Sequence, residues 1–149
     1  MATESTVEFF KQHSNLLHSP FLEIGSLIYE SYVQYSPKEM QPVKPDDEYI
    51  GIDIFPGEGV DRILDLANAS EEELKEWKGK FSTVHIHYVM EHVKDIFKMA
   101  SNIDYIMKPG GVVCVSGPFA GRVHGIRIDM GGCPPESVDC LVCKCEIHP

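Results

Sequence analysis

The chain has 149 residues, of which 43% are apolar and 24% charged, the composition of one folded domain with a substantial core. Its formal net charge of -10 argues against nucleic acid as the main partner, because phosphate binding needs a basic face. No apolar run is long enough to span a bilayer, and the N-terminus lacks the pattern of a secretory signal. We therefore expect a cytoplasmic protein whose five cysteines are reduced.

The apolar patterns predict strands that alternate with helices. Residues 1–19 predict an amphipathic helix, which Pro20 ends. Ser70 and Glu73 form a capping-box pattern at the start of a second helix, and "EHVKDIFKMASNIDYIM" has the apolar spacing of a third. The predicted strands are "FLEIGSLI", "YIGIDIF", "DRILDL", "STVHIHYV" and "VVCVSGPF". This alternation is typical of an α/β domain with a mostly parallel sheet.

One connection does not fit that pattern. Parallel strands need a crossover of a dozen or more residues, but only Pro56–Val60 separates "YIGIDIF" from "DRILDL". Spacing alone predicts a hairpin there, and a stretched, helix-free crossover is the other interpretation.

Acidic residues stand at the ends of three predicted strands, namely Glu23, Asp53 and Asp65. In an open parallel sheet, ligands sit at the carboxyl ends of the strands, where a carboxylate can accept both hydroxyls of a ribose. A single such residue more often caps a helix or turn. Three in consecutive strands favour a ligand site.

Five phrases follow one another between Phe21 and His124: "FLEIGS", "YIGIDIFPGEGVD", "ILDLANA", "FSTVHIHYVMEHV" and "YIMKPGGVVCVSGPF". In this order they resemble class I S-adenosylmethionine-dependent methyltransferases of the type 11 branch. In that branch a phrase like "GVDI-PGPGVD" follows the first strand, and "LEHV", "LKPGG" and a "PF" segment come later. The resemblance implies a Rossmann-like, mostly parallel sheet with flanking helices, and S-adenosyl-L-methionine as the cofactor.

The resemblance also implies roles for the first half of the chain. Glu23 and Gly25 match the family's first motif, where the chain turns beneath the methionine part of the cofactor. Asp53 matches the acidic residue that binds the ribose hydroxyls. The glycines after Asp53 would then let the chain bend away from the ribose.

Further roles fall on later strands. By the same resemblance, Asp65 and Leu66 match the pair that meets the adenine, through a side chain and a backbone amide. His87 and Tyr88 fall where residues border the methionine end of the cofactor and the substrate. His124 lies where the active-site mouth is expected, and its neutral imidazole is our candidate for a general base. A solvated loop histidine is the alternative interpretation.

The chain departs from the family pattern in three ways. Gly25 is followed by Ser26, Leu27 and Ile28 instead of further glycines, so bulkier side chains would crowd the cofactor. Ser82 stands where an aspartate is common. The chain supplies five strands of the family's usual seven, which implies a shortened form or a sheet completed by another chain.

Two clusters raise the question of a metal. His85 and His87 share one face of a strand and could bind a metal, but packing in the core or hydrogen bonding to the cofactor is the favoured interpretation. Cys140 and Cys143 have the gap of a zinc site, but a cysteine-rich helix with free thiols is the favoured interpretation. We predict no metal site.

The sequence therefore predicts a single domain over residues 1–149, with a cofactor-binding core at 20–124 and a cysteine-rich tail at 125–149. The predicted function is S-adenosylmethionine-dependent methyl transfer to a small-molecule acceptor. The alternative is a non-catalytic methyltransferase-like domain for binding or assembly, with a degenerate cofactor site. The strand "VVCVSGPF" is apolar on both faces and is expected at an edge of the sheet. The tail could cover this edge, but it is long enough for only one short helix, and an uncovered apolar edge favours pairing with another chain. We therefore predict a homo-oligomer that buries Val112–Phe119.

Overall fold

The structure, a computed structural model, describes residues 4–28, 44–117 and 141–144. In these described residues, six strands form one sheet in the order β3-β2-β1-β4-β5-β6. The first five strands are parallel, which confirms the predicted α/β class. The strands are β1 (Phe21–Ile24), β2 (Tyr49–Asp53), β3 (Arg62–Ile63), β4 (Phe81–His87), β5 (Met107–Ser116) and β6 (Leu141–Lys144).

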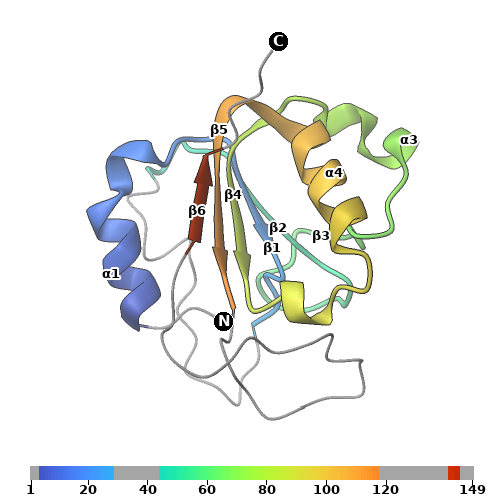
Figure 1. The fold of residues 1–149 in the computed structure, drawn as a ribbon, viewed down its shortest axis with the longest axis horizontal. Coiled ribbons are helices and arrows are strands. Elements are labelled where there is room, and N and C mark those ends of the chain that lie inside the picture. The colour runs from blue at the N-terminus through green and yellow to red at the C-terminus, as the bar shows by residue number, and fades with distance from the viewer. Residues whose placement is uncertain (1–3, 29–43, 118–140, 145–149) are drawn as a thin grey trace.

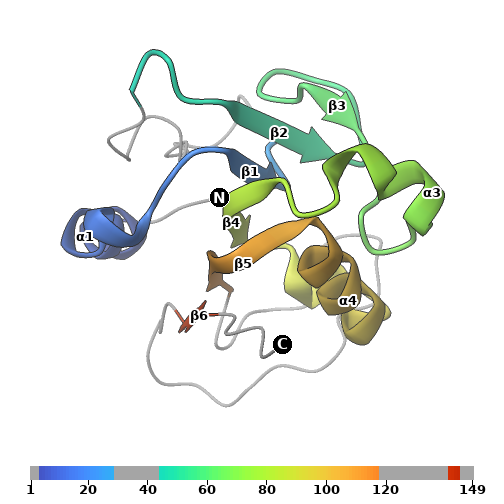
Figure 2. The ribbon, with the colours of Figure 1, turned by 90° about the horizontal axis from the view of Figure 1, so that it is seen from above.

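The described helices cover both faces of this sheet. One face carries α1 (Glu4–Gln12), and the other carries α3 (Glu71–Leu74) and α4 (Ile96–Ile106), as Figures 1 and 2 show from two directions. Short 3-10 turns, at Ser14–Leu16, Lys75–Trp77 and Met90–His92, extend or precede these elements. The result is a three-layer arrangement, with the strands in the middle.

The face toward α3 and α4 is an apolar core. Alternate strand residues point to this side because successive side chains of a strand face opposite ways. α4 presents Met99, Ile103 and Ile106 to them, and all three are buried. The buried strand residues of this core are Leu22, Ile24, Ile52, Phe81, Val84, Ile86, Met107 and Val113.

The face toward α1 is more polar. Phe10 of α1 is fully buried and packs with Phe21, Val112 and Cys114. Between these apolar residues the same face carries polar strand residues that the register places side by side: Glu23, Thr83, His85, His87 and Ser116. The two faces of the sheet therefore differ in chemistry as well as in their helices.

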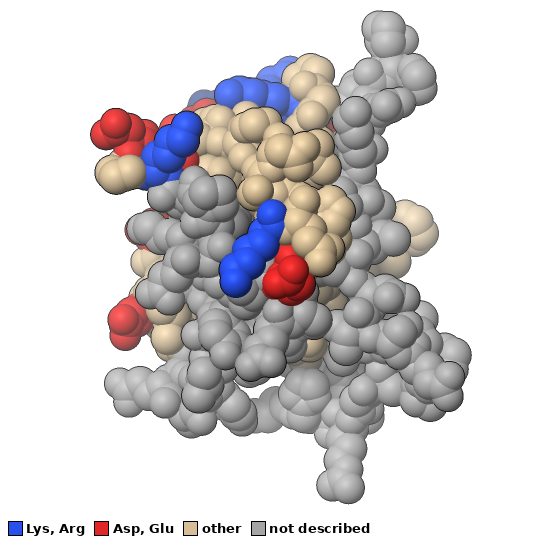
Figure 3. Space-filling model, turned by 90° about the vertical axis from the view of Figure 1, so that its left-hand side faces the viewer, with Lys and Arg blue, Asp and Glu red and all other residues tan. Residues whose placement is uncertain are grey.

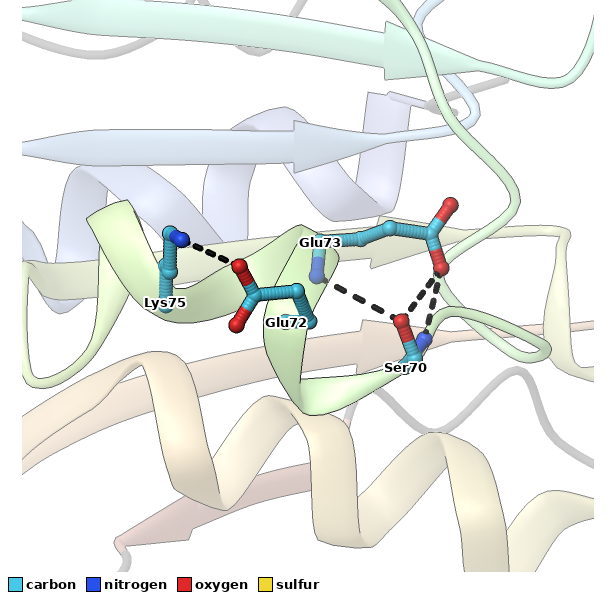
Figure 4. A network of polar contacts seen from close by, with 4 residues as sticks. All are labelled: Ser70, Glu72, Glu73 and Lys75. Carbon is cyan, nitrogen blue, oxygen red and sulfur yellow. Dashed lines mark hydrogen bonds and ion pairs between the residues drawn. The ribbon is translucent and has the colours of Figure 1, made fainter.

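The capping box at α3 forms as predicted (Figure 4). The backbone N–H of Glu73 donates to Ser70 Oγ at 3.4 Å, and Glu73 Oε2 accepts from the backbone N–H of Ser70 at 2.9 Å. The backbone N–H of Ser70 and its hydroxyl, which donates to Glu73 Oε2 at 2.7 Å, lower the pKa of the Glu73 carboxyl. Lys75 also pairs with Glu72 on the exposed side of this turn. Local sequence therefore determines where this helix begins.

The short connection after β2 is a helix-free crossover. β2 and β3 pair in parallel, with Asp53 opposite Ile63, so the helix-free crossover is confirmed and the hairpin that spacing alone predicts is wrong. The chain closes the crossover with a turn in which Val60 N–H donates to the Gly57 carbonyl at 3.2 Å. Because β3 is only two residues long, few residues have to be brought into parallel register.

The edge beyond β5 is occupied by a strand that we did not predict. β6 pairs antiparallel with β5, and Val112–Val115 lie opposite Leu141–Lys144. For these residues the expected short helix of the tail is therefore wrong. The prediction of a homo-oligomer depended on an open edge at Val112–Phe119, and β6 removes that reason for it.

The surface on the α1 side has mixed charge. Figure 3 shows Lys and Arg side chains interspersed with Asp and Glu on this side of the molecule. None of the described helices combines the length and the apolar character that crossing a bilayer requires.

Candidate functional site

The carboxyl ends of the parallel strands meet at one edge of the sheet. β1 lies between β2 and β4. From β1 the sheet continues through β2 to β3 on one side and through β4 to β5 on the other, so the direction in which successive strands are added reverses between β1 and β4. In open α/β sheets the crevice at such a switch point is where ligands bind. The segments that leave the strands there begin at Gly25, Ile54, Leu64, Tyr88 and Gly117.

The exit of β1 is a tight turn at Gly25. Its φ of +80° lies in the left-handed region that favours glycine, and its N–H donates to the Ile52 carbonyl at 2.8 Å. A Cβ on Gly25 would lie 2.3 Å from Cγ2 of Val89, which comes from the segment after β4. The glycine is therefore required by backbone conformation and by the close approach of the β4 exit.

The residues after Gly25 pack against the crossover between β2 and β3. A Cβ on Gly59 would lie 2.5 Å from the Ser26 carbonyl oxygen, and one on Gly57 would lie 2.2 Å from Cδ1 of Leu27. Gly59 also has a positive φ, of +84°. The glycines of "PGEG" thus make room for Ser26 and Leu27, which occupy positions where the resemblance to class I methyltransferases implies glycine.

Asp53 is the last residue of β2 and is partly exposed at the edge. Its Oδ1 accepts from the backbone N–H of Phe55 at 3.0 Å, and its Oδ2 lies 3.4 Å from the backbone nitrogen of Leu27. A carboxylate has about four acceptor positions, so these two contacts leave capacity for hydroxyl donors. The chain therefore presents an oriented carboxylate at the exit of β2.

Asp65 and Leu66 follow β3 and differ in their surroundings. The exposed Asp65 accepts from Asn68, with 2.8 Å between Oδ2 and Nδ2. The Leu66 side chain is buried in the core, so a ligand would meet its backbone.

Asn102 holds this segment from the neighbouring helix. It is 2% exposed on α4, and its Nδ2 donates to the carbonyls of Leu66 at 2.7 Å and Ala69 at 3.0 Å. We did not single out Asn102 from the sequence. The available signal was a polar residue at a core-facing position, between Met99 and Ile103.

Glu23 precedes the last residue of β1, on the α1 face of the sheet. Its Oε2 accepts from the Tyr49 hydroxyl at 2.7 Å. Burial, followed by the nearby Glu23 carboxylate, raises the pKa of the Tyr49 hydroxyl well above its usual range. Tyr49 is therefore a fixed hydrogen-bond donor that orients Glu23.

The two histidines of β4 lie in the core under α1. The His87 ring accepts or donates a hydrogen bond with Ser116 Oγ at 2.6 Å, and the ring of Phe10 stands edge-on to both His85 and His87. Burial holds the pKa of His85 well below its usual value and that of His87 at about 3. Both rings are packed in the core, as the favoured interpretation of the sequence predicted. At the end of β4 the His87 imidazole is therefore buried, and the backbone of the strand faces the carboxyl edge of the sheet.

Tyr88 follows His87 with a φ of 55°, which is uncommon for a residue other than glycine. Its N–H donates to the Ser116 carbonyl at 2.8 Å and extends the pairing of β4 with β5 by one residue. The left-handed conformation then turns the chain toward Val89, which packs over Gly25.

The general-base candidate His124 and the tail residue Cys140 both lie outside the described residues. The side chain of Cys143 in β6 is likewise not described. In the part of the chain that the structure describes, no three His, Cys, Asp or Glu side chains are grouped so that they could hold a metal.

The residues at the carboxyl edge fit a nucleoside. Asp53 offers acceptor positions for hydroxyls, the Gly25 turn lets backbone approach a ligand closely, and the segment at Leu66 offers main-chain groups at the next strand exit. Among the described residues, a pocket lies by the amino ends of β1 and β2, lined by Ser14, Leu17, His18, Ser19, Lys44 and Asp47.

Comparisons with known proteins agree with this geometry. A family model described as "Methyltransferase domain" matches residues 31–130. Similar solved structures include S-adenosylmethionine-dependent methyltransferases from Archaeoglobus fulgidus, Mesorhizobium loti and Aquifex aeolicus. Their identities are 20%, 12% and 11%, each with a TM-score of 0.52. At these identities the likeness concerns the fold.

The matches differ in coverage. The alignments cover 77%, 78% and 81% of this chain, and 52%, 53% and 69% of the three relatives in the same order. The chain therefore spans about half the length of the first two. No curated protein matches it.

Proposed function

The chain belongs to the methyltransferase domain family, and we propose that it transfers a methyl group from S-adenosylmethionine to a small-molecule acceptor. The observation that carries the proposal is Asp53. It is an oriented carboxylate at the exit of β2, next to the strand pair where the sheet order reverses.

The chain's own residues would bind and position the cofactor. Asp53 would accept hydrogen bonds from the ribose hydroxyls, and the backbone around Leu66 would meet the adenine. The turn at Gly25 would run beneath the methionine part. When bound, S-adenosylmethionine supplies a methyl group already activated by a sulfonium, so the protein's main task is to align the acceptor with it.

The packing of Ser26 and Leu27 supports cofactor binding. These residues replace the usual glycines, which suggested a crowded site. The Leu27 side chain lies against Gly57 in the crossover, whereas the Ser26 side chain lies against Gly51 of β2 and its carbonyl against Gly59. The bulk introduced after Gly25 is therefore accommodated between β1 and the β2–β3 connection.

The alternative is a methyltransferase-like domain that binds or assembles without catalysis. What favours it is the limited coverage, since the chain spans about half of two of the solved relatives. A domain of this kind with a degenerate site would bind neither S-adenosylmethionine nor its demethylated product.

Calorimetric titration with S-adenosylhomocysteine tests the proposal. Wild-type protein should bind, and Asp53→Ala should bind about 1.5–3 kcal/mol more weakly, or roughly tenfold to a hundredfold, because the ligand hydroxyls lose a charged acceptor. Asp104→Ala is the matched control, since Asp104 is exposed on α4 and away from the edge. Equal affinities of wild type and Asp53→Ala would refute the ribose assignment, and no binding by the wild type would favour the non-catalytic alternative.

A further inference from the structure

Glu91 has an unusual environment for a carboxylate. Both of its oxygens are buried, and neither has a hydrogen-bond partner among the residues that the structure describes. None of the ion pairs among the described residues includes Glu91. Buried carboxylates are normally paired or hydrogen-bonded, because removing the charge from water without a donor is costly. A position that keeps such a group is a candidate for binding a ligand that supplies the donor.

The location of Glu91 places this group beside the switch point. It belongs to the short helical turn Met90–His92, between the end of β4 and the start of α4 (Figure 1). Its Oε2 is 3.8 Å from where a Cβ on Gly117 would stand, and Gly117 directly follows the last residue of β5. The carboxylate therefore lies between the exits of β4 and β5.

The same segment reaches both halves of the edge. Val89 packs over Gly25 at the exit of β1, while Glu91, two residues later, lies by Gly117 at the exit of β5. The residues that fit a nucleoside, Gly25 and Asp53, lie on the β1–β2 side. Glu91 thus stands on the other side of the crevice, where a second reactant would approach.

We propose that Glu91 binds the methyl acceptor, and that the acceptor presents an amine to it. The inference rests on the proposed function. An amine supplies the N–H donors that Glu91 lacks, and its nitrogen becomes positively charged during the reaction. An alcohol supplies one donor, and a carboxylate acceptor would repel Glu91.

The charge balance explains why a carboxylate suits this position. The lone pair of a neutral amine forms the N–C bond while the S–C bond breaks, and the electron pair of that bond goes to sulfur. The positive charge of the sulfonium is thereby moved to nitrogen, and the extra N–H proton is later lost to water. A fixed carboxylate next to the nitrogen stabilises the charge that develops there, so it acts more strongly in the transition state than in the ground state.

The first test measures the folded protein alone. Glu91→Gln keeps the shape and removes the charge, so the melting temperature should rise by about 3–6 °C if the carboxylate is buried without a donor. Glu71→Gln is the matched control, because Glu71 is exposed at the start of α3 and its change should have little effect. A melting temperature of Glu91→Gln equal to or below that of wild type would overturn the premise.

The second test measures ligands. Butylamine, benzylamine and tryptamine, and in parallel butanol, benzyl alcohol and benzoate, are titrated at millimolar concentration with and without S-adenosylhomocysteine. At least one amine should bind wild type, and Glu91→Gln should weaken it by about tenfold or more while Glu71→Gln leaves it unchanged.

The outcomes separate the two proposals. Binding of S-adenosylhomocysteine should be the same in wild type and Glu91→Gln, and its absence in the wild type would count against the proposed function only. The inference about Glu91 is overturned if no amine binds, if the alcohols or benzoate bind in preference to the amines, or if Glu91→Gln binds amines as well as wild type.

Discussion

Replacing Asn102 by alanine should destabilise the domain more than any exposed polar change. The side chain is 2% exposed, and its Nδ2 is the donor for two carbonyl oxygens, those of Leu66 and Ala69. Alanine removes both hydrogen bonds and leaves both oxygens buried in a space too apolar to replace them. Each lost donor costs about 1–2 kcal/mol, so the free energy of unfolding should fall by about 2–4 kcal/mol.

Urea denaturation measures this change. With an m-value of about 2 kcal/mol/M, the midpoint of Asn102→Ala should fall by about 1–2 M, with m unchanged. Asn102→Asp should be at least as destabilising at neutral pH, because it places an acceptor against two acceptors. The control is Asn68→Ala, since Asn68 is exposed and donates to Asp65.

The control should lose less than about 1 kcal/mol. If Asn102→Ala unfolds at the same urea concentration as wild type, the two carbonyls have other donors and the reasoning fails. A change in m as well as in midpoint would mean that the change acts on the unfolded ensemble instead.

Two further predictions concern the crossover and the buried histidines. Gly59→Ala should cost about 2–4 kcal/mol of unfolding free energy, because its Cβ would strike the Ser26 carbonyl at 2.5 Å in addition to the strain of a positive φ. Gly110→Ala, with a φ of +78° and nothing within 4 Å, should cost about 1 kcal/mol, and equal urea midpoints for the two variants would contradict the packing argument. For His85 and His87 the folded pKa values lie below the usual 6.5, that of His87 at about 3, so below about pH 6.5 the unfolded chain binds protons that the folded state does not. The free energy of unfolding should therefore fall by about 1–2 kcal/mol per histidine between pH 7 and pH 5. Urea titrations at the two pH values measure this, and the free energy of unfolding of His87→Asn should depend less on pH than that of wild type.

The sequence by itself determined the kinds of element and their order. Apolar periodicity located the helix at α4 and the five parallel strands, because periods of 3.6 and 2 follow from backbone geometry alone. Ser70 and Glu73 determined the start of α3, since their capping box involves residues three apart. The placement of Asp53 at the exit of a strand was likewise readable, because the glycines and the proline that follow it end the strand.

Only the tertiary structure decided how these elements meet. Spacing left a hairpin and a helix-free crossover open at Pro56–Val60. The chain forms the crossover, where the exit of β1 packs against Gly57 and Gly59, a contact between segments about thirty residues apart. The contact of Leu27 with Gly57 also explains how the chain accommodates a leucine where the resemblance implies glycine.

The partners of Asn102 and the surroundings of Glu91 were also beyond the sequence. Asn102 reaches carbonyls more than thirty residues earlier in the chain, and Glu91 lies by Gly117 at the end of another strand. β6 pairs with β5 across residues far apart in sequence, which no local pattern specified. Periodicity and capping act within a few residues, whereas register, edge pairing and burial of polar groups depend on the packing of distant segments.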